Sequence, residues 1–172
     1  WAKLDLQELR RFEPLLQAQT ARTAGLKGDL PELLAAVAHV HQRNATVDLG
    51  RLACAIAAKI RADAGALGLV EQKVRTTTTQ DEALQHVLID AIVRADTAVS
   101  RNALIGLMSD PTLPQKLREQ VLASTAQVAT PDALFVSDLR KMVLFSEDEV
   151  YCSLAAVTTG AVLYRWYELD PQ

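Results

Sequence analysis

The sequence is poor in the residues that break or cross-link a chain. Its 172 residues include two cysteines, seven glycines and six prolines, and only 5% of them are aromatic. Two cysteines are too few for a disulfide scaffold. Hydrophobic residues make up 49% and charged residues 23%, which excludes disorder for most of the chain. Because alanine, leucine and valine recur throughout, the composition predicts an all-α protein whose helices pack closely through small side chains.

The sequence also has no excess of positive charge. Eighteen Lys and Arg residues against 21 Asp and Glu residues give a formal charge of −3. A nucleic acid or an anionic membrane surface would demand a cationic field, so neither is expected as a partner. The longest apolar stretch, residues 150–164, contains Cys, Ser and Thr and is shorter than the roughly 20 residues that span a bilayer. The sequence therefore predicts no transmembrane segment.

Apolar residues recur at offsets of three and four, the spacing of one helix face. We expect each such row to pack in a common core. The rows are Leu30, Leu33, Leu34, Val37 and Val40; Leu49, Leu52, Ala53, Ile56 and Ile60; Leu84, Val87, Leu88, Ala91 and Ile92; Leu117, Val121, Leu122 and Val128; Phe135, Leu139, Met142 and Val143; and Val150, Leu154, Val157, Ala161 and Tyr164.

Helix starts are predicted where a side-chain oxygen precedes Glu or Gln by three residues. Four pairs fit: Asp29 with Glu32, Thr79 with Glu82, Thr112 with Gln115, and Ser146 with Glu149. Thr130 before Pro131 is a fifth start, and Thr46 and Thr97 are two more. Successive starts at Thr46, Thr79, Thr112 and Ser146 lie 33, 33 and 34 residues apart. This period predicts an α-solenoid of about nine helices in antiparallel pairs.

The repeat motif narrows the choice of solenoid. The Thr-Pro-Leu-His turn of ankyrin repeats does not occur, and neither does the Trp, Leu-Gly and Tyr pattern of tetratricopeptide repeats. The remaining interpretation is HEAT-like pairs in one helical-repeat domain over residues 1–172. Because the chain begins with Trp1 rather than Met, we expect a piece of a longer or processed protein.

Residues 88–143 carry a more specific pattern. Leu-Ile-Asp-Ala-Ile at 88–92 is followed by Asp-Thr at 96–97, by Arg118 in a later helix and by Thr-Pro at 130–131. This order resembles the helical domain of vitellogenin-like large lipid transfer proteins, with Asp96 where that family has Gly. The resemblance implies a helical layer that wraps lipid-binding β-sheets, and a secreted or periplasmic location. Without the resemblance, the compartment stays open.

No catalytic or cofactor-binding constellation is found in the sequence, and no metal site is expected. His39 and His41 point about 200° apart on a helix and cannot chelate one ion together. His86 has no Cys or carboxylate pattern around it. Cys54 and Cys152 are 98 residues apart, which places them in distant repeats, so we expect two buried thiols and no disulfide. The acidic run at 147–149 is expected to favour a helix N-terminus through the helix dipole.

The aromatic residues gather at the C-terminus. Four of the eight lie in the last 22 residues, namely Tyr151, Tyr164, Trp166 and Tyr167. Rings of this kind are enriched at protein interfaces, although a heavier terminal cap on the solenoid explains them equally well. We therefore expect Tyr164, Trp166 and Tyr167 to contact a protein partner, a neighbouring domain or a second copy.

The sequence favours a non-enzymatic scaffold or protein interaction module, because solenoids present long binding surfaces. The alternative, a helical part of a lipid-transfer protein, follows from the vitellogenin-like resemblance. The β-sheets that form the lipid cavity in that family are not encoded in these 172 residues.

Overall fold

The computed structural model describes residues 29–35, 49–77, 81–146 and 148–169. These residues form helices joined by short turns, and no β-strand occurs among them. The predicted all-α class is therefore confirmed. Residues 30–35 are helical, and seven further helices follow: α3 (Leu49–Ala62), α4 (Ala64–Thr76), α5 (Glu82–Ala95), α6 (Ala98–Ser109), α7 (Gln115–Thr125), α8 (Ala133–Phe145) and α9 (Glu149–Leu169).

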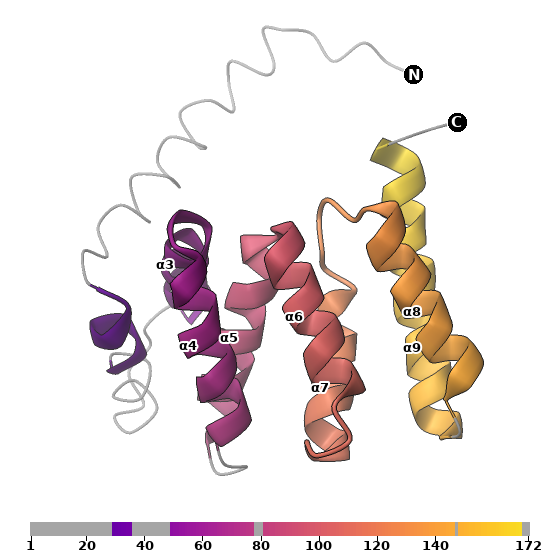
Figure 1. Cartoon of the computed structure of the whole chain (residues 1–172), viewed down its shortest axis with the longest axis horizontal. Coiled ribbons are helices and arrows are strands. Elements are labelled where there is room, and N and C mark those ends of the chain that lie inside the picture. The colour runs from indigo at the N-terminus through magenta and orange to yellow at the C-terminus, as the bar shows by residue number, and fades with distance from the viewer. Residues whose placement is uncertain (1–28, 36–48, 78–80, 147, 170–172) are drawn as a thin grey trace, which may run out of the picture.

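The helices lie in two layers (Figure 1). One layer contains α3, α5, α7 and α9, each in contact with the next, and the other contains α4, α6 and α8. In the first layer the helices begin at Leu49, Glu82, Gln115 and Glu149, which are 33, 33 and 34 residues apart. The chain passes from one layer to the other at almost every turn, so successive helices run in opposite directions.

The core lies between the layers and is richest around α5. Leu88, Ile89 and Ile92 of α5 are fully buried, as are Leu52 and Ile56 of α3. Each such side chain contributes about 1.5–3 kcal/mol when removed from water. Helix α5 is enclosed because it contacts α3, α4, α6 and α7. The predicted apolar row of α5 is therefore a core row, and so is that of α3 except for Leu49, which is exposed.

Two of the predicted helix starts are confirmed. Asp29 and Glu32 exchange hydrogen bonds, with Glu32 N donating to Asp29 Oδ1 at 3.0 Å. Thr97 accepts a bond from Ser100 N at 3.1 Å, while Thr97 N donates to Ser100 Oγ at 2.8 Å. Each pair satisfies two N–H groups at a helix N-terminus. The predicted starts at Thr46 and Thr79 lie outside the described residues.

Three other predicted starts are wrong by two residues. The N-cap of α7 is Pro114 rather than Thr112, and that of α8 is Asp132 rather than Thr130. At α9, Asp148 rather than Ser146 accepts the bond, from Tyr151 N at 2.8 Å.

At α8 and α9 the helix begins later than predicted because an aspartate lies two residues further along the chain. An ionised carboxylate accepts a stronger hydrogen bond than a hydroxyl does, and negative charge is favoured at a helix N-terminus. The hydroxyls of Thr112 and Thr130 are bonded to Asp110 and Asp96 instead. At α7 no side chain caps the helix, and Pro114 has no N–H to satisfy.

The predicted core row of α9 is also wrong. Val150, Val157 and Tyr164 are exposed, whereas Leu154 and Ala161 are half-buried. The buried residues of α9 are Tyr151, Ala155, Thr158, Thr159 and Val162. These follow the same offsets one position further on, so the helix is rotated by about one residue relative to the prediction. Three of the five residues in its predicted row therefore face away from the core, whereas Leu154 packs against it.

Candidate functional site

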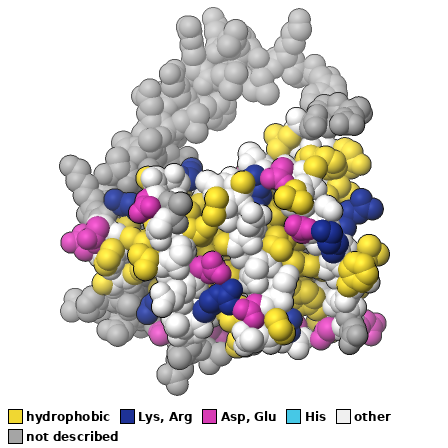
Figure 2. All heavy atoms as spheres, in the orientation of Figure 1, with side chains coloured by type: hydrophobic (Ala, Val, Ile, Leu, Met, Phe, Trp, Pro, Cys, Tyr) yellow, Lys and Arg dark blue, Asp and Glu magenta, His cyan; other side chains and the backbone are white. Residues whose placement is uncertain are grey.

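The outer face of α9 exposes large hydrophobic side chains, as the end of α8 does at Leu144 and Phe145. Six exposed residues follow one another at offsets of three and four: Val150, Ser153, Val157, Gly160, Tyr164 and Tyr167. We call them the α9 row. Val157 is 71% exposed, Tyr164 65% and Tyr167 57%. Hydrophobic side chains are visible on the surface along the α8–α9 edge (Figure 2). Such a row on a helix is the pattern that packs against another helix.

Gly160 lies in the middle of the α9 row, and packing within the described chain does not require a glycine there. A Cβ added there would have no atom within 4 Å apart from the helix's own backbone and its chain neighbours. Glycine inside a helix costs about 1 kcal/mol relative to alanine. Since nothing within the described chain requires the missing side chain, the surface around Gly160 is suited to close approach by another backbone.

The three predicted contact residues do not share one environment. Tyr164 and Tyr167 lie on the exposed row, and a hydrogen bond with Glu168 raises the pKa of Tyr164. Trp166 is half-buried and packs against the core. Its ring centroid lies 5.4 Å from that of Tyr167, with the planes tilted by 39°. Only the two tyrosines are therefore placed to meet a partner directly.

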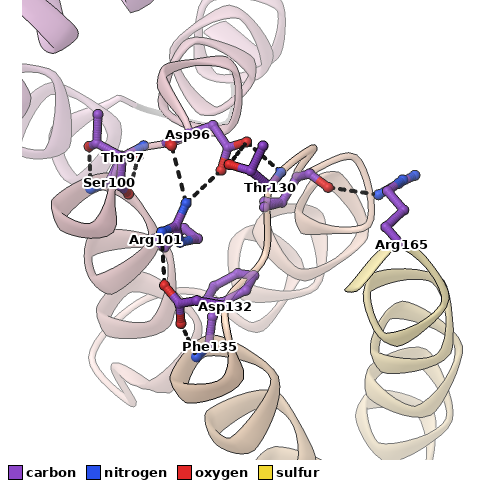
Figure 3. Close-up of polar contacts among 9 residues, drawn as sticks. Asp96, Thr97, Ser100, Arg101, Thr130, Asp132, Phe135 and Arg165 are labelled. Atoms are coloured by element: carbon purple, nitrogen blue, oxygen red, sulfur yellow. Dashed lines mark hydrogen bonds and ion pairs between the residues drawn. The ribbon is translucent and has the colours of Figure 1, made fainter. Parts of the chain in front are cut away.

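A polar network joins the turns at one end of the helices (Figure 3). Arg101 donates to Asp96 Oδ1 at 2.9 Å and to Asp132 Oδ2 at 2.8 Å. Asp96 Oδ2 also accepts from Thr130 N and Oγ1, at 2.7 and 2.8 Å. Arg165 donates to the carbonyls of residues 126 and 128. We call these five residues, Asp96, Arg101, Thr130, Asp132 and Arg165, the Asp96 network.

The Asp96 network stabilises the arrangement of α5, α6, α8 and α9. The side chains of Arg101 and Asp96 are only 11% and 13% exposed. Asp96 adopts a left-handed backbone conformation, with φ of 46°, at the end of α5. Aspartate tolerates this conformation better than most residues. The N–H of Phe135 and the guanidinium of Arg101 lower the pKa of Asp132. Apart from the buried Nε of Arg101, which has no hydrogen-bond partner, these groups bond to one another or to the backbone, so the network is structural.

At the opposite end of the helices is an open groove. It has a volume of about 640 Å³ and lies among α6, α7, α8 and α9. Its apolar lining consists of Ile105, Met108, Met142, Phe145 and Tyr151. The volume is within the range of small-molecule sites. We call it the Arg118 groove, after the arginine at its wall.

Arg118 is held in the groove by stacking alone. Its guanidinium carbon lies 5.6 Å from the ring centroid of Tyr151. Its Nε is buried and has no hydrogen-bond partner, and the side chain forms no ion pair with any residue in the described part of the chain. Tyr151 in turn donates its hydroxyl to Met108 O at 2.9 Å, and burial raises its pKa.

The other charged and amide side chains at the Arg118 groove have partners. Lys141 pairs with Asp138 at 2.6 Å. Gln115 donates to Asp148 Oδ2 at 2.8 Å. Arg118 is therefore the cation of the groove that lacks an anion, counted among the residues the structure describes.

A second hollow, of about 650 Å³, lies beside α3 and α5. Its most conspicuous group is Cys54, whose Sγ accepts a long contact from Arg94 at 3.7 Å. Arg94 is already paired with Asp90 at 2.8 Å. The prediction that both thiols are buried is wrong, since Cys54 and Cys152 are partly accessible; both are free thiols.

The remaining predicted positions form no site. No group of three or more His, Cys, Asp or Glu residues able to hold a metal ion occurs in residues 29–35, 49–77, 81–146 and 148–169. His86 is exposed, and His39, His41 and Glu147 lie outside the described residues. None of the described helices combines the length and apolar character needed to cross a bilayer.

Sequence reasoning placed Arg118 only within the family resemblance and missed the groove. One local signal was present. The first turn of α7 contains basic residues and no acidic ones, although a helix N-terminus favours negative charge. The helix N-terminus therefore does not explain a cation in this position.

Comparison of the chain with protein-family models, with curated proteins and with solved structures finds no match.

Proposed function

We propose that this protein is a non-enzymatic interaction module, built as an α-solenoid of HEAT-like helix pairs, which binds a second copy of itself through α9. The observation that carries the proposal is the exposed α9 row. The spacing of 33 to 34 residues between the starts of α3, α5, α7 and α9, together with the two layers, supports the solenoid.

The order of residues along the α9 row favours a second copy as the partner. Its N-terminal half carries small side chains and its C-terminal half carries two tyrosines. If two copies of α9 pair antiparallel about a point between Val157 and Gly160, Tyr167 faces Val150 and Tyr164 faces Ser153. Val157 then faces Gly160. Each bulky side chain meets a small one, which is the self-complementarity that a two-fold interface requires.

Gly160→Ala tests this interface. We expect the substitution to raise the stability of the monomer by about 0.5–1 kcal/mol, because the new methyl group meets nothing in the chain. We expect it to weaken self-association, because the methyl group would separate the two helices. Sedimentation velocity over a concentration series measures association, and thermal unfolding measures stability.

Gly106→Ala on α6 is the matched control, because a Cβ there also has open space around it. It should raise stability without changing association. A second pair of variants distinguishes contact with a partner from packing within the chain. Tyr167→Ala should weaken association, whereas Trp166→Ala should lower stability. The proposal is wrong if the wild-type chain is monomeric at all concentrations, or if Gly160→Ala and Gly106→Ala behave alike.

The lipid-transfer alternative rests on the vitellogenin-like resemblance alone. Organic extraction of the purified protein followed by mass spectrometry tests it, since a carrier should contain stoichiometric lipid.

A further inference from the structure

The Arg118 groove contains a positive charge that the described chain leaves unpaired. Other arginines of the bundle are used internally: Arg75 pairs with Glu71 and Asp110, Arg94 with Asp90, and Arg101 with Asp96 and Asp132. Arg118 has only the face of the Tyr151 ring. An arginine presents five N–H donors in a fixed plane, and such a charged donor bonds an anion more strongly than a neutral acceptor. The missing component of this site is therefore a hydrogen-bond acceptor, preferably an anion.

The ring of Tyr151 fixes the position of this guanidinium. Tyr151 is itself anchored by its bond to Met108 O, across the floor of the groove from α9 to α6. Stacking on an aromatic face leaves the edge of a guanidinium free for in-plane bonds. An anion can therefore bind Arg118 without displacing any contact that the structure contains.

The walls of the groove indicate what the anion is attached to. Ile105, Met108, Met142 and Phe145 line it, and methionine side chains adapt readily to apolar ligands. Asp138 and Asp148 also lie at its rim. Two carboxylates nearby disfavour a ligand of high negative charge, such as a phosphate. A single negative charge on an apolar chain satisfies both the unpaired cation and the lining.

The geometry points to a binding site for a small carboxylate with an apolar chain, whose carboxylate accepts hydrogen bonds from Arg118 while its chain lies against Met108, Met142 and Phe145. The groove is bounded by four helices and has a volume of about 640 Å³, which suits a small molecule. This site is separate from the α9 row, because its α9 residue is Tyr151, on the buried side of that helix.

Isothermal titration calorimetry with octanoate and with octanol, on the whole chain, tests the site. Octanoate should bind the wild-type protein, and octanol should bind at least about tenfold more weakly because its neutral hydroxyl accepts a weaker hydrogen bond from a guanidinium than a carboxylate does. Arg118→Met should reduce octanoate affinity by about tenfold or more, and should abolish the preference for octanoate over octanol. Arg118→Lys should bind octanoate with intermediate affinity, because lysine keeps the charge and loses the planar donor set.

Arg140→Met is the matched control, since Arg140 is an exposed arginine of α8 that does not line the groove. It changes the net charge by the same amount and should leave octanoate binding unchanged. Thermal unfolding of each variant checks that it is folded. The inference is overturned if octanoate does not bind, if octanoate and octanol bind equally, or if Arg118→Met binds octanoate as the wild type does.

Discussion

An arginine lies at each end of the helical stack, and the two differ in their bonding partners. At one end, Arg101 joins three separate elements through Asp96 and Asp132 and is almost completely buried. At the other end, Arg118 lies over Tyr151 and bonds to nothing else among the described residues. The difference shows how the same residue type can be part of a fold or part of a site. A charge whose partners are in the chain fixes structure, whereas a charge without them is available to a ligand.

The largest expected effect separates the two arginines. Arg101→Met should lower the free energy of unfolding by about 2–3 kcal/mol, because it leaves Asp96 and Asp132 without their cation. Arg118→Met should change it by less than about 1 kcal/mol, since the lost stacking is offset by removal of an unbonded buried N–H. Urea unfolding followed by circular dichroism measures both. Equal losses would remove the distinction between the two ends.

The structural end was partly predictable from sequence. Thr97 was identified as a helix start, and it lies next to Asp96 in the network. The bonds of Asp96 and Arg101 to the turn at 130–132 were not predictable, because they join residues 31 to 34 positions apart that meet only when the layers form. The same tertiary contacts explain the shifted start of α8, since Thr130 is bonded to Asp96 and Asp132 becomes the cap.

The faces of the helices show the same limit. Periodicity identifies residues that share a face. This was sufficient for α5, whose predicted row is buried throughout, and for α3 except at Leu49. Periodicity cannot say whether a neighbour exists. In the described chain α9 packs against α7 and α8 and bonds to α6 through Tyr151. These contacts cover Tyr151, Ala155 and Val162 and leave Val157 exposed. The sequence therefore identifies the residues that share a face of α9, but not which face other helices cover.

A smaller effect tests what stabilises the open end of the helical stack, which is the end with the Arg118 groove. Tyr151→Phe should lower the free energy of unfolding by about 1 kcal/mol, because the buried Met108 carbonyl loses its hydrogen bond from the Tyr151 hydroxyl. The ring remains, so the stacking with Arg118 is kept and octanoate binding should persist. Tyr167→Phe on the same helix is the control and should have almost no effect on stability, as its side chain is exposed. Equal stability changes in the two variants would argue against a structural role for the Tyr151 hydroxyl.

The smallest expected effect is a pH dependence that compares one carboxylate from each end. Bonds from Thr112 and Arg75 lower the pKa of Asp110, in the α6–α7 turn, from 3.8 to about 2. Bonds from Phe135 N and Arg101 likewise lower the pKa of Asp132. A carboxylate whose pKa is lower in the folded state stabilises the fold above its unfolded pKa, and this contribution is lost as the pH falls through the folded value. For Asp110 the loss is therefore expected between about pH 4 and pH 2.

Asp110→Asn and Asp132→Asn measure these contributions, since asparagine keeps the shape and one of the two accepting oxygens but loses the charge and the second acceptor. Each variant should be less stable than the wild type at pH 7, and the difference should close on acidification. The difference should be larger for Asp132→Asn, because Asp132 bonds both a helix N-terminus and the nearly buried Arg101, whereas the ion pair of Asp110 is with the more exposed Arg75. Chemical unfolding from pH 7 to pH 2 provides the measurement. If Asp110→Asn has the larger effect, the ion pairs of the open end contribute more to the fold than those of the Asp96 network, and the contrast between the two ends is reversed.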